Sequence, residues 1–223
     1  MAMRLRSQIP ARGESFAAVT EVALVLGPSV PGALESLRNA TRSRHASLGA
    51  SPAMRRLFEA TYSLGEYRTH LGRLLGIVEP LERAVVRAAE AGDPLLSLRR
   101  TDALREDLRR MGVSAHDVEG LERCRSVPAI SPAGLRGYGY VALGSMLGGK
   151  IIVKRLRTVL GGKASFRFYG DENGRGEARW ASFCTGLEAD ATADVPAICS
   201  TAVAIFDAYG AWLAEPFARD GNR

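Results

Sequence analysis

The sequence predicts a single all-α domain, and three of its features carry that prediction. Aromatic residues make up only 7% of the 223 residues, whereas Ala, Leu and Arg, which favour helices over strands, are abundant. Apolar residues recur at steps of three and four in most segments, which is the period of a helix. Hydrophobic residues make up 46% of the chain, enough for one domain, or at most two, with a buried core.

The two ends of the chain are expected to lie outside this domain. Residues 1–30 contain an apolar stretch, but Glu21 interrupts it, so we interpret the segment as an N-terminal extension rather than an export signal. Residues 31–217 form the predicted helical domain, and residues 218–223 form a short tail. No run reaches the roughly 18 apolar residues of a membrane span, so we expect no membrane association.

Apolar spacing and helix-ending residues place the first helices. Residues 33–48 carry one apolar stripe, and a stretch with Gly and Pro ends it. A short helix at 52–61 is followed by a long one that starts at Ser63, because Ser63 and Glu66 have the spacing of a capping box. This long helix is expected to reach about Ala91, where Gly-Asp-Pro follows.

The rest of the chain continues the helical pattern with helices of mixed length. Five further helices are expected, and they span residues 101–111, 114–125, 131–160, 176–193 and 195–217. Between the third and fourth of these, residues 165–169 fit either a short strand or irregular chain. Helices of such unequal length argue against a symmetric bundle.

Charge and cysteine usage limit the partners and the compartment. The net charge of +6 favours an acidic partner of some kind, without choosing among nucleic acid, an anionic protein and an anionic ligand. Cys124, Cys184 and Cys199 are odd in number and form no Cys-x-x-Cys pair, so neither a disulfide framework nor a metal cluster is expected. This usage fits a reducing compartment and predicts a cytoplasmic protein.

A histidine and an arginine share one face of the helix at 33–48. A histidine such as His45 on an apolar helix face is usually a satisfied core residue, but a neutral imidazole is also a good axial ligand for haem iron. Arg38 lies two turns earlier on the same face. There it can meet a carboxylate of a haem that His45 holds, or it can be a solvated charge. His70 and His116 fit ordinary polar positions.

The helix at 131–160 carries three glycines within six residues. Each interior glycine destabilises a helix by about 1 kcal/mol relative to Ala, so this segment is an unfavourable helix. Gly144 and Gly148 share a face, and Gly149 widens the bare patch. A bare face allows close approach to a flat macrocycle or close packing of another helix, and the sequence leaves both readings open.

Taken together, these two segments resemble the haem oxygenases. Ala40-Thr-Arg-Ser-Arg-His45 resembles their proximal-helix motif, whose histidine is the axial iron ligand. Leu143-Gly-Ser-Met-Leu-Gly-Gly149 resembles their distal-helix glycine motif, which lies across the other face of the haem. The two motifs lie about a hundred residues apart, as in the family, and the resemblance covers roughly residues 31–216.

The resemblance implies roles for single residues. His45 would be the metal ligand, while Arg38 and Tyr140 would contact a propionate. The residues expected to bind haem are His45, Arg38, Tyr140, Gly144, Gly148, Gly149 and Arg179. The expected catalytic set is Gly144, Ser145 and Gly148. Mammalian members have an aspartate at the position of Ser145, and bacterial members with serine usually have asparagine next, where this chain has Met146.

The implied activity is the oxidative opening of haem b, which is both cofactor and substrate, to biliverdin, carbon monoxide and iron. The resemblance further implies an external electron donor, such as a ferredoxin or a flavin reductase, and a phytochrome as one receiver of biliverdin. Four basic residues after the glycines either dock an acidic ferredoxin or form a solvated helix face, and they are Lys150, Lys154, Arg155 and Arg157.

Two other functions remain open at this point. The first is a non-catalytic haem-binding or haem-trafficking protein on the same fold, because the distal Asp and Asn are missing. The second is a helical regulator that binds nucleic acid through its positive charge. The basic residues are scattered and no helix-turn-helix pattern is present, so we expect no nucleic-acid partner.

Overall fold

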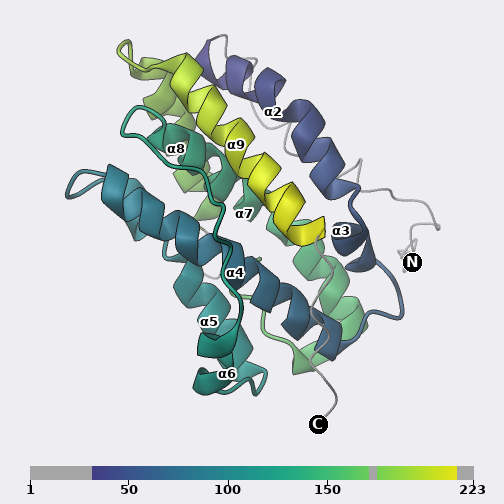
Figure 1. The fold of residues 1–223 in the computed structure, drawn as a ribbon. Helices are drawn as coiled ribbons and strands as arrows, with labels where there is room; N and C mark the ends of the chain where they lie inside the picture. Colours follow the sequence, from purple (N-terminus) through teal and green to yellow (C-terminus); the bar gives the residue numbers. More distant parts are fainter. Residues whose placement is uncertain (1–31, 171–174, 215–223) are drawn as a thin grey trace, which may run out of the picture.

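The computed structural model describes residues 32–170 and 175–214, and this part of the chain contains helices and connections but no strand (Figure 1). The predicted all-α class is confirmed. The α-helices are α2 (Ala33–Gly49), α3 (Pro52–Arg56), α4 (Leu64–Ala88), α5 (Arg100–Arg110), α6 (Ala115–Gly120), α7 (Leu135–Leu160), α8 (Gly176–Ala189) and α9 (Val195–Ala214). Two short 3-10 helices are η1 (Pro94–Ser97) and η2 (Gly161–Lys163).

The differences from the expected boundaries lie mostly at helix ends. The predicted extension 1–30 and the tail 218–223 lie outside the described residues. α6 ends at Gly120 rather than at 125, because Leu121 already has an extended backbone. Residues 165–169 are irregular chain and not a strand. The buried carboxylate of Asp107 accepts hydrogen bonds from Ser165, Arg167 and Phe168, which holds this segment in place without strand pairing.

Local capping explains where the two longest early helices begin. At α4, the Ser63 side chain accepts from the backbone N–H of Glu66, and the Glu66 carboxylate accepts from the backbone N–H of Ser63. The predicted capping box is therefore confirmed. α2 has no cap from its own residues, and the Glu188 carboxylate of α8 accepts the Leu34 N–H at 2.7 Å instead. This contact ties the start of α2 to α8.

The helices pack around two neighbouring apolar clusters. α9 packs against both α2 and α7, and α4 packs against α5 (Figure 1). One cluster joins α4, α5 and the second half of α7 through residues such as Leu71, Leu104 and Leu156. The other joins α2, α4, the first half of α7, α8 and α9 through residues such as Leu37 and Ile205.

α9 is the one helix among the described residues that is long and apolar enough to cross a membrane. We expected no such helix from the sequence. Its apolar composition has an explanation within the fold, because α9 packs along both α2 and α7 and buries Ile198, Ile205 and Phe206 in the second cluster.

Glycines at the start of α7 allow close helix packing. A Cβ atom at Gly137 would lie 2.4 Å from the carbonyl oxygen of Ile198 in α9, and one at Gly139 would lie 2.8 Å from the Phe183 ring in α8. Real Cβ atoms do not approach so closely, so the backbone of α9 requires glycine at position 137, whereas at position 139 the Phe183 and Leu95 side chains would have to shift. The packing reading therefore holds for Gly137 and fits Gly139, which both precede the three glycines singled out in the sequence.

Candidate functional site

A mostly apolar cavity of about 200 Å³, partly open to solvent, lies where the two apolar clusters meet. Its walls come from segments far apart in the sequence. α2 contributes Arg38 and His45, α4 contributes Leu74 and Val78, and α9 contributes Ile205, Phe206 and Tyr209. Most of the remaining wall comes from α7, from Trp180 of α8 and from the irregular segment with Phe168 and Tyr169, and α3 and α5 each contribute one residue, Met54 and Arg100.

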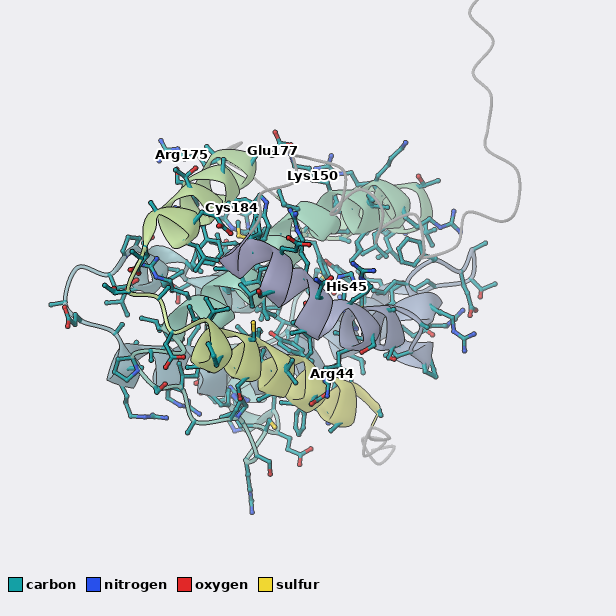
Figure 2. The ribbon with its side chains drawn as sticks, turned by 90° about the horizontal axis from the view of Figure 1, so that it is seen from above. Arg44, His45, Lys150, Arg175, Glu177 and Cys184 are labelled. Atoms are coloured by element: carbon teal, nitrogen blue, oxygen red, sulfur yellow. The ribbon has the colours of Figure 1, made fainter. Side chains whose placement is uncertain are left out.

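His45 is the cavity residue best suited to bind a metal. The imidazole ring packs edge to face against the Phe206 ring, with 5.7 Å between the ring centroids. Neither of its ring nitrogens has a hydrogen-bond partner among the residues that the structure describes. Burial lowers the pKa of His45 below its ordinary value of 6.5, so the imidazole is neutral at neutral pH. Figure 2 shows Arg44 directed toward α9, where it pairs with Asp207, while His45 lies on the other side of α2.

The other two histidines do not compete for this role. Nε2 of His70 lies 2.6 Å from the Tyr169 hydroxyl, and the two rings stack. Burial lowers the pKa of His70 to about 4, so it is a neutral, satisfied residue that does not line the cavity. The side chain of His116 is 99% exposed. Of the three histidines in the sequence, only His45 lines the cavity.

Arg38 and Tyr140 are brought together beside His45. Both residues line the cavity, and the positive charge of Arg38 acts on the Tyr140 hydroxyl, whose pKa burial raises. The Tyr140 hydroxyl lies 3.4 Å from the hydroxyl of Thr41, which donates to the carbonyl oxygen of Leu37. Arg38 has no acidic partner within residues 32–170 and 175–214, so its guanidinium is available to an anion.

Gly144, Ser145 and Gly148 line the cavity from α7. A Cβ atom at Gly144 would make only an ordinary contact, 3.7 Å, with the Trp180 ring, so packing against the rest of the protein does not require glycine here. The Ser145 hydroxyl donates to the carbonyl oxygen of Ala142 at 2.8 Å. Its only proton is therefore already engaged with the backbone of its own helix.

Gly149 and Arg179 lie outside the cavity lining. A Cβ atom at Gly149 would lie 2.2 Å from the carbonyl oxygen of Tyr169, so this glycine packs against the irregular segment rather than widening the bare face. At Arg179 the register differs from the expectation. Trp180 lines the cavity and stacks with Phe183, and neighbouring helical residues point about 100° apart, so Arg179 points elsewhere.

Sequence reasoning missed two arginines of the cavity. Arg42 lines it from α2 and donates to Asn39. Arg100 lines it from the first residue of α5, with its guanidinium 4.0 Å above the Phe168 ring. The Ala40–His45 motif contains Arg42 and was the one available signal for it. No local pattern marks Arg100, because its neighbours come from α7, α9 and the irregular segment.

This set of residues suits a flat, metal-bearing macrocycle with carboxylate arms. Among the described residues no group of three His, Cys, Asp or Glu side chains can hold a metal ion by itself. The cavity instead offers one neutral imidazole, apolar walls, an unobstructed glycine face and a cation without an acidic partner. A metal that arrives with its own ring of ligands needs no more from the protein.

Comparison with known proteins agrees with this description. The family model described as Heme oxygenase matches residues 32–215, a stretch that includes every helix described above. A search of the curated proteins finds no match.

Proposed function

Because the chain belongs to the haem oxygenase family, we propose that it binds one haem b per chain and opens the ring oxidatively to biliverdin, carbon monoxide and iron. One observation carries this proposal. His45, whose ring nitrogens are free of protein partners, lines the same cavity as the unobstructed Gly144 and as Gly148 of α7. An imidazole ligand on one wall and a bare helix on another are what a bound haem with one open iron position requires.

Haem, when bound, supplies the iron that activates oxygen, and the chain supplies its position. His45 would hold the iron through its imidazole, which its lowered pKa keeps neutral at neutral pH. Arg38 and Tyr140 orient the macrocycle by holding a propionate, an anion that no acidic residue of this wall competes with. The apolar walls exclude water, and Gly144 leaves room for a small ligand beside α7.

A non-catalytic haem carrier is the second candidate, and the geometry of Ser145 favours it. The family resemblance places a water-ordering aspartate at this position in mammalian members. Here the hydroxyl of Ser145 donates to Ala142 and so does not offer its proton to the cavity. Turnover therefore requires another polar group near the iron, and without one the bound haem would remain intact.

Electron delivery by an external ferredoxin or flavin reductase is part of the proposal, as is a phytochrome as one receiver of biliverdin. Of the four basic residues after the glycines, Lys150 donates to Glu177 at 2.6 Å and Arg155 donates to the carbonyl oxygen of Phe58. Lys154 and Arg157 are exposed on α7. A docking surface for an acidic donor would therefore centre on these two residues.

One experiment separates enzyme from carrier. Haemin is added to the purified protein, then a reductant in air, and the absorption spectrum is followed. We expect loss of the haem Soret band and growth of a biliverdin band. A stable ferrous–oxygen complex would select the carrier, and no spectral change on adding haemin would exclude both functions.

A further inference from the structure

The inner wall of the cavity contains a buried positive charge. Arg100 lines the cavity and is only 5% exposed. Its guanidinium lies 4.0 Å above the Phe168 ring, and its Nη2 nitrogen is buried without a hydrogen-bond partner within residues 32–170 and 175–214. Arginine stays protonated in proteins even where burial opposes its charge.

No acidic side chain forms an ion pair with this guanidinium among the residues that the structure describes. Glu82 is the nearby carboxylate, and its charge attracts Arg100 from a distance, but its oxygens accept the backbone N–H groups of Arg100 and Thr101 at the start of α5 and not the guanidinium. The other ionisable groups beside Arg100 are tyrosine hydroxyls, those of Tyr138, Tyr169 and Tyr209. Burial raises the pKa of all three hydroxyls, so they are neutral and balance no charge.

A buried cation without a direct ion pair is costly in the folded protein. Removing a charge from water costs several kcal/mol unless a partner of opposite charge compensates, and stacking on one aromatic ring returns only about 2 kcal/mol of this. Arg38 and Arg42 reach the same cavity from α2, where each is partly or fully exposed. Arg100 therefore differs from them, because its charge is buried, and Coulomb forces are stronger between buried charges than between exposed ones.

We propose that Arg100 makes the inner end of the cavity a site for negative charge, so that an anionic ligand of the bound iron is held more tightly than a neutral one. This inference rests on the proposed haem-binding function and deepens it. Turnover requires a polar group near the iron, and the Ser145 hydroxyl does not supply it because it donates to Ala142. The inference assigns this role to Arg100. A single buried positive charge beside the cavity is enough to discriminate by charge without touching the iron itself.

The test compares two probes of the ferric haem complex, azide as the anion and imidazole as the neutral ligand, each titrated by the Soret band. Arg100→Met should weaken azide roughly tenfold or more while changing imidazole affinity less than about threefold. Arg100→Lys keeps the charge and should keep most of the azide affinity. Arg110→Met removes the same charge from the exposed end of α5, outside the cavity, and should change neither affinity.

Each other outcome overturns the inference. Arg100 would not be a charge-selective group if Arg100→Met bound azide as tightly as the wild type, or if it lost azide and imidazole affinity equally. The same would follow if Arg110→Met lost as much azide affinity as Arg100→Met. Where Arg100→Met does not fold, Arg100→Gln, which keeps a planar polar head without charge, carries the comparison. A wild-type protein that binds no haem overturns the proposed function as well, whereas a haem complex without azide discrimination overturns only this inference.

Discussion

Histidine and glycine occur both in the cavity wall and in the packed core, but they have different roles in the two regions. His45 on α2 and His70 on α4 are both made neutral by burial. His70 satisfies its ring with the Tyr169 hydroxyl, whereas the ring nitrogens of His45 have no partner among the described residues. A neutral histidine can serve as a metal ligand only where the fold leaves a ring nitrogen without a protein partner, and of these two histidines His45 meets that condition.

The glycines of α7 repeat this contrast within a few residues. Gly149 is required by the backbone of Tyr169, while Gly144 meets nothing closer than an ordinary contact with Trp180. Gly149 is needed for the packing of the helix against the Tyr169 backbone, whereas no packing contact requires glycine at position 144, where it lines the cavity. The two readings that the sequence left open are thus both present in one helix, at different positions.

Replacing His45 with Ala is the strongest test of the difference between His45 and His70. Haem should still enter, because the apolar walls and Arg38 remain, but biliverdin formation should fall by roughly a hundredfold or more, about 2.7 kcal/mol in the activation barrier. Added imidazole should fill the gap and restore part of the rate. The measurements are the ferric spectrum and the rate of biliverdin formation.

His70→Gln is the matched control for that substitution. It removes the other buried histidine but leaves the cavity lining intact, so the histidine-ligated spectrum should persist. If His45→Ala kept a histidine-ligated spectrum and near-normal turnover, His45 would be a core residue and the central assignment would be wrong.

Charge at the cavity edge should affect how haem is seated more than its chemistry. Arg38→Ala combined with Tyr140→Phe removes a charge-assisted contact to a propionate, which should weaken haem binding by about 1.5–3 kcal/mol or change the mixture of biliverdin isomers. Arg44→Ala removes the same charge from α2, but Arg44 pairs with Asp207 outside the cavity, so it should do neither. Unchanged affinity and isomer ratio in the double variant would remove both residues from the site.

The satisfied histidine predicts how stability depends on pH. The pKa of His70 is about 4 in the folded protein and about 6.5 in the unfolded chain, so the unfolded chain binds the proton more readily. The free energy of unfolding should be level above about pH 7.5 and fall by about 2 kcal/mol between pH 7 and pH 5 from this residue alone. Urea unfolding of the haem-free protein at both pH values measures it.

His70→Gln should lose about that much of the pH dependence. A smaller slope of the same sign should remain, because the pKa of His45 is lowered as well. Equal slopes in the wild type and the variant would mean that His70 is already protonated within the fold at pH 5 at no cost.

Replacing Gly149 and replacing Gly144 with Ala should change the free energy of unfolding in opposite directions. Gly149→Ala forces a methyl group against Tyr169, which should destabilise the haem-free protein by about 1–2 kcal/mol after the gain in helix propensity. Gly144→Ala keeps that gain, up to about 1 kcal/mol, but should weaken haem binding because the methyl group enters the cavity. Urea unfolding and haem titration of both variants test the pair, and shifts of the same sign in unfolding would contradict it.

The sequence by itself was sufficient for the helical class, the capping box of α4 and the pairing of the His45 and glycine motifs. The first two properties depend on residues close together in the chain, where periodicity and spacing carry the information, whereas the two motifs lie about a hundred residues apart and were paired through the resemblance to the family. The sequence did not determine the ends of an element, or the conformation of a segment, where a residue far away in the chain holds them. α2 begins against Glu188 of α8, and the segment at 165–169 follows Asp107 of α5, neither of which is a neighbour in sequence.

Only the tertiary structure decided which members of each residue type face the cavity. It placed Trp180 in the wall instead of Arg179, and it separated Gly144 from Gly149 by their neighbours. It also brought Arg100 to the inner wall, a position that no local pattern marks. The physical reason is that the role of a side chain depends on the residues that contact it in the folded protein. These contacts join residues that are far apart along the chain.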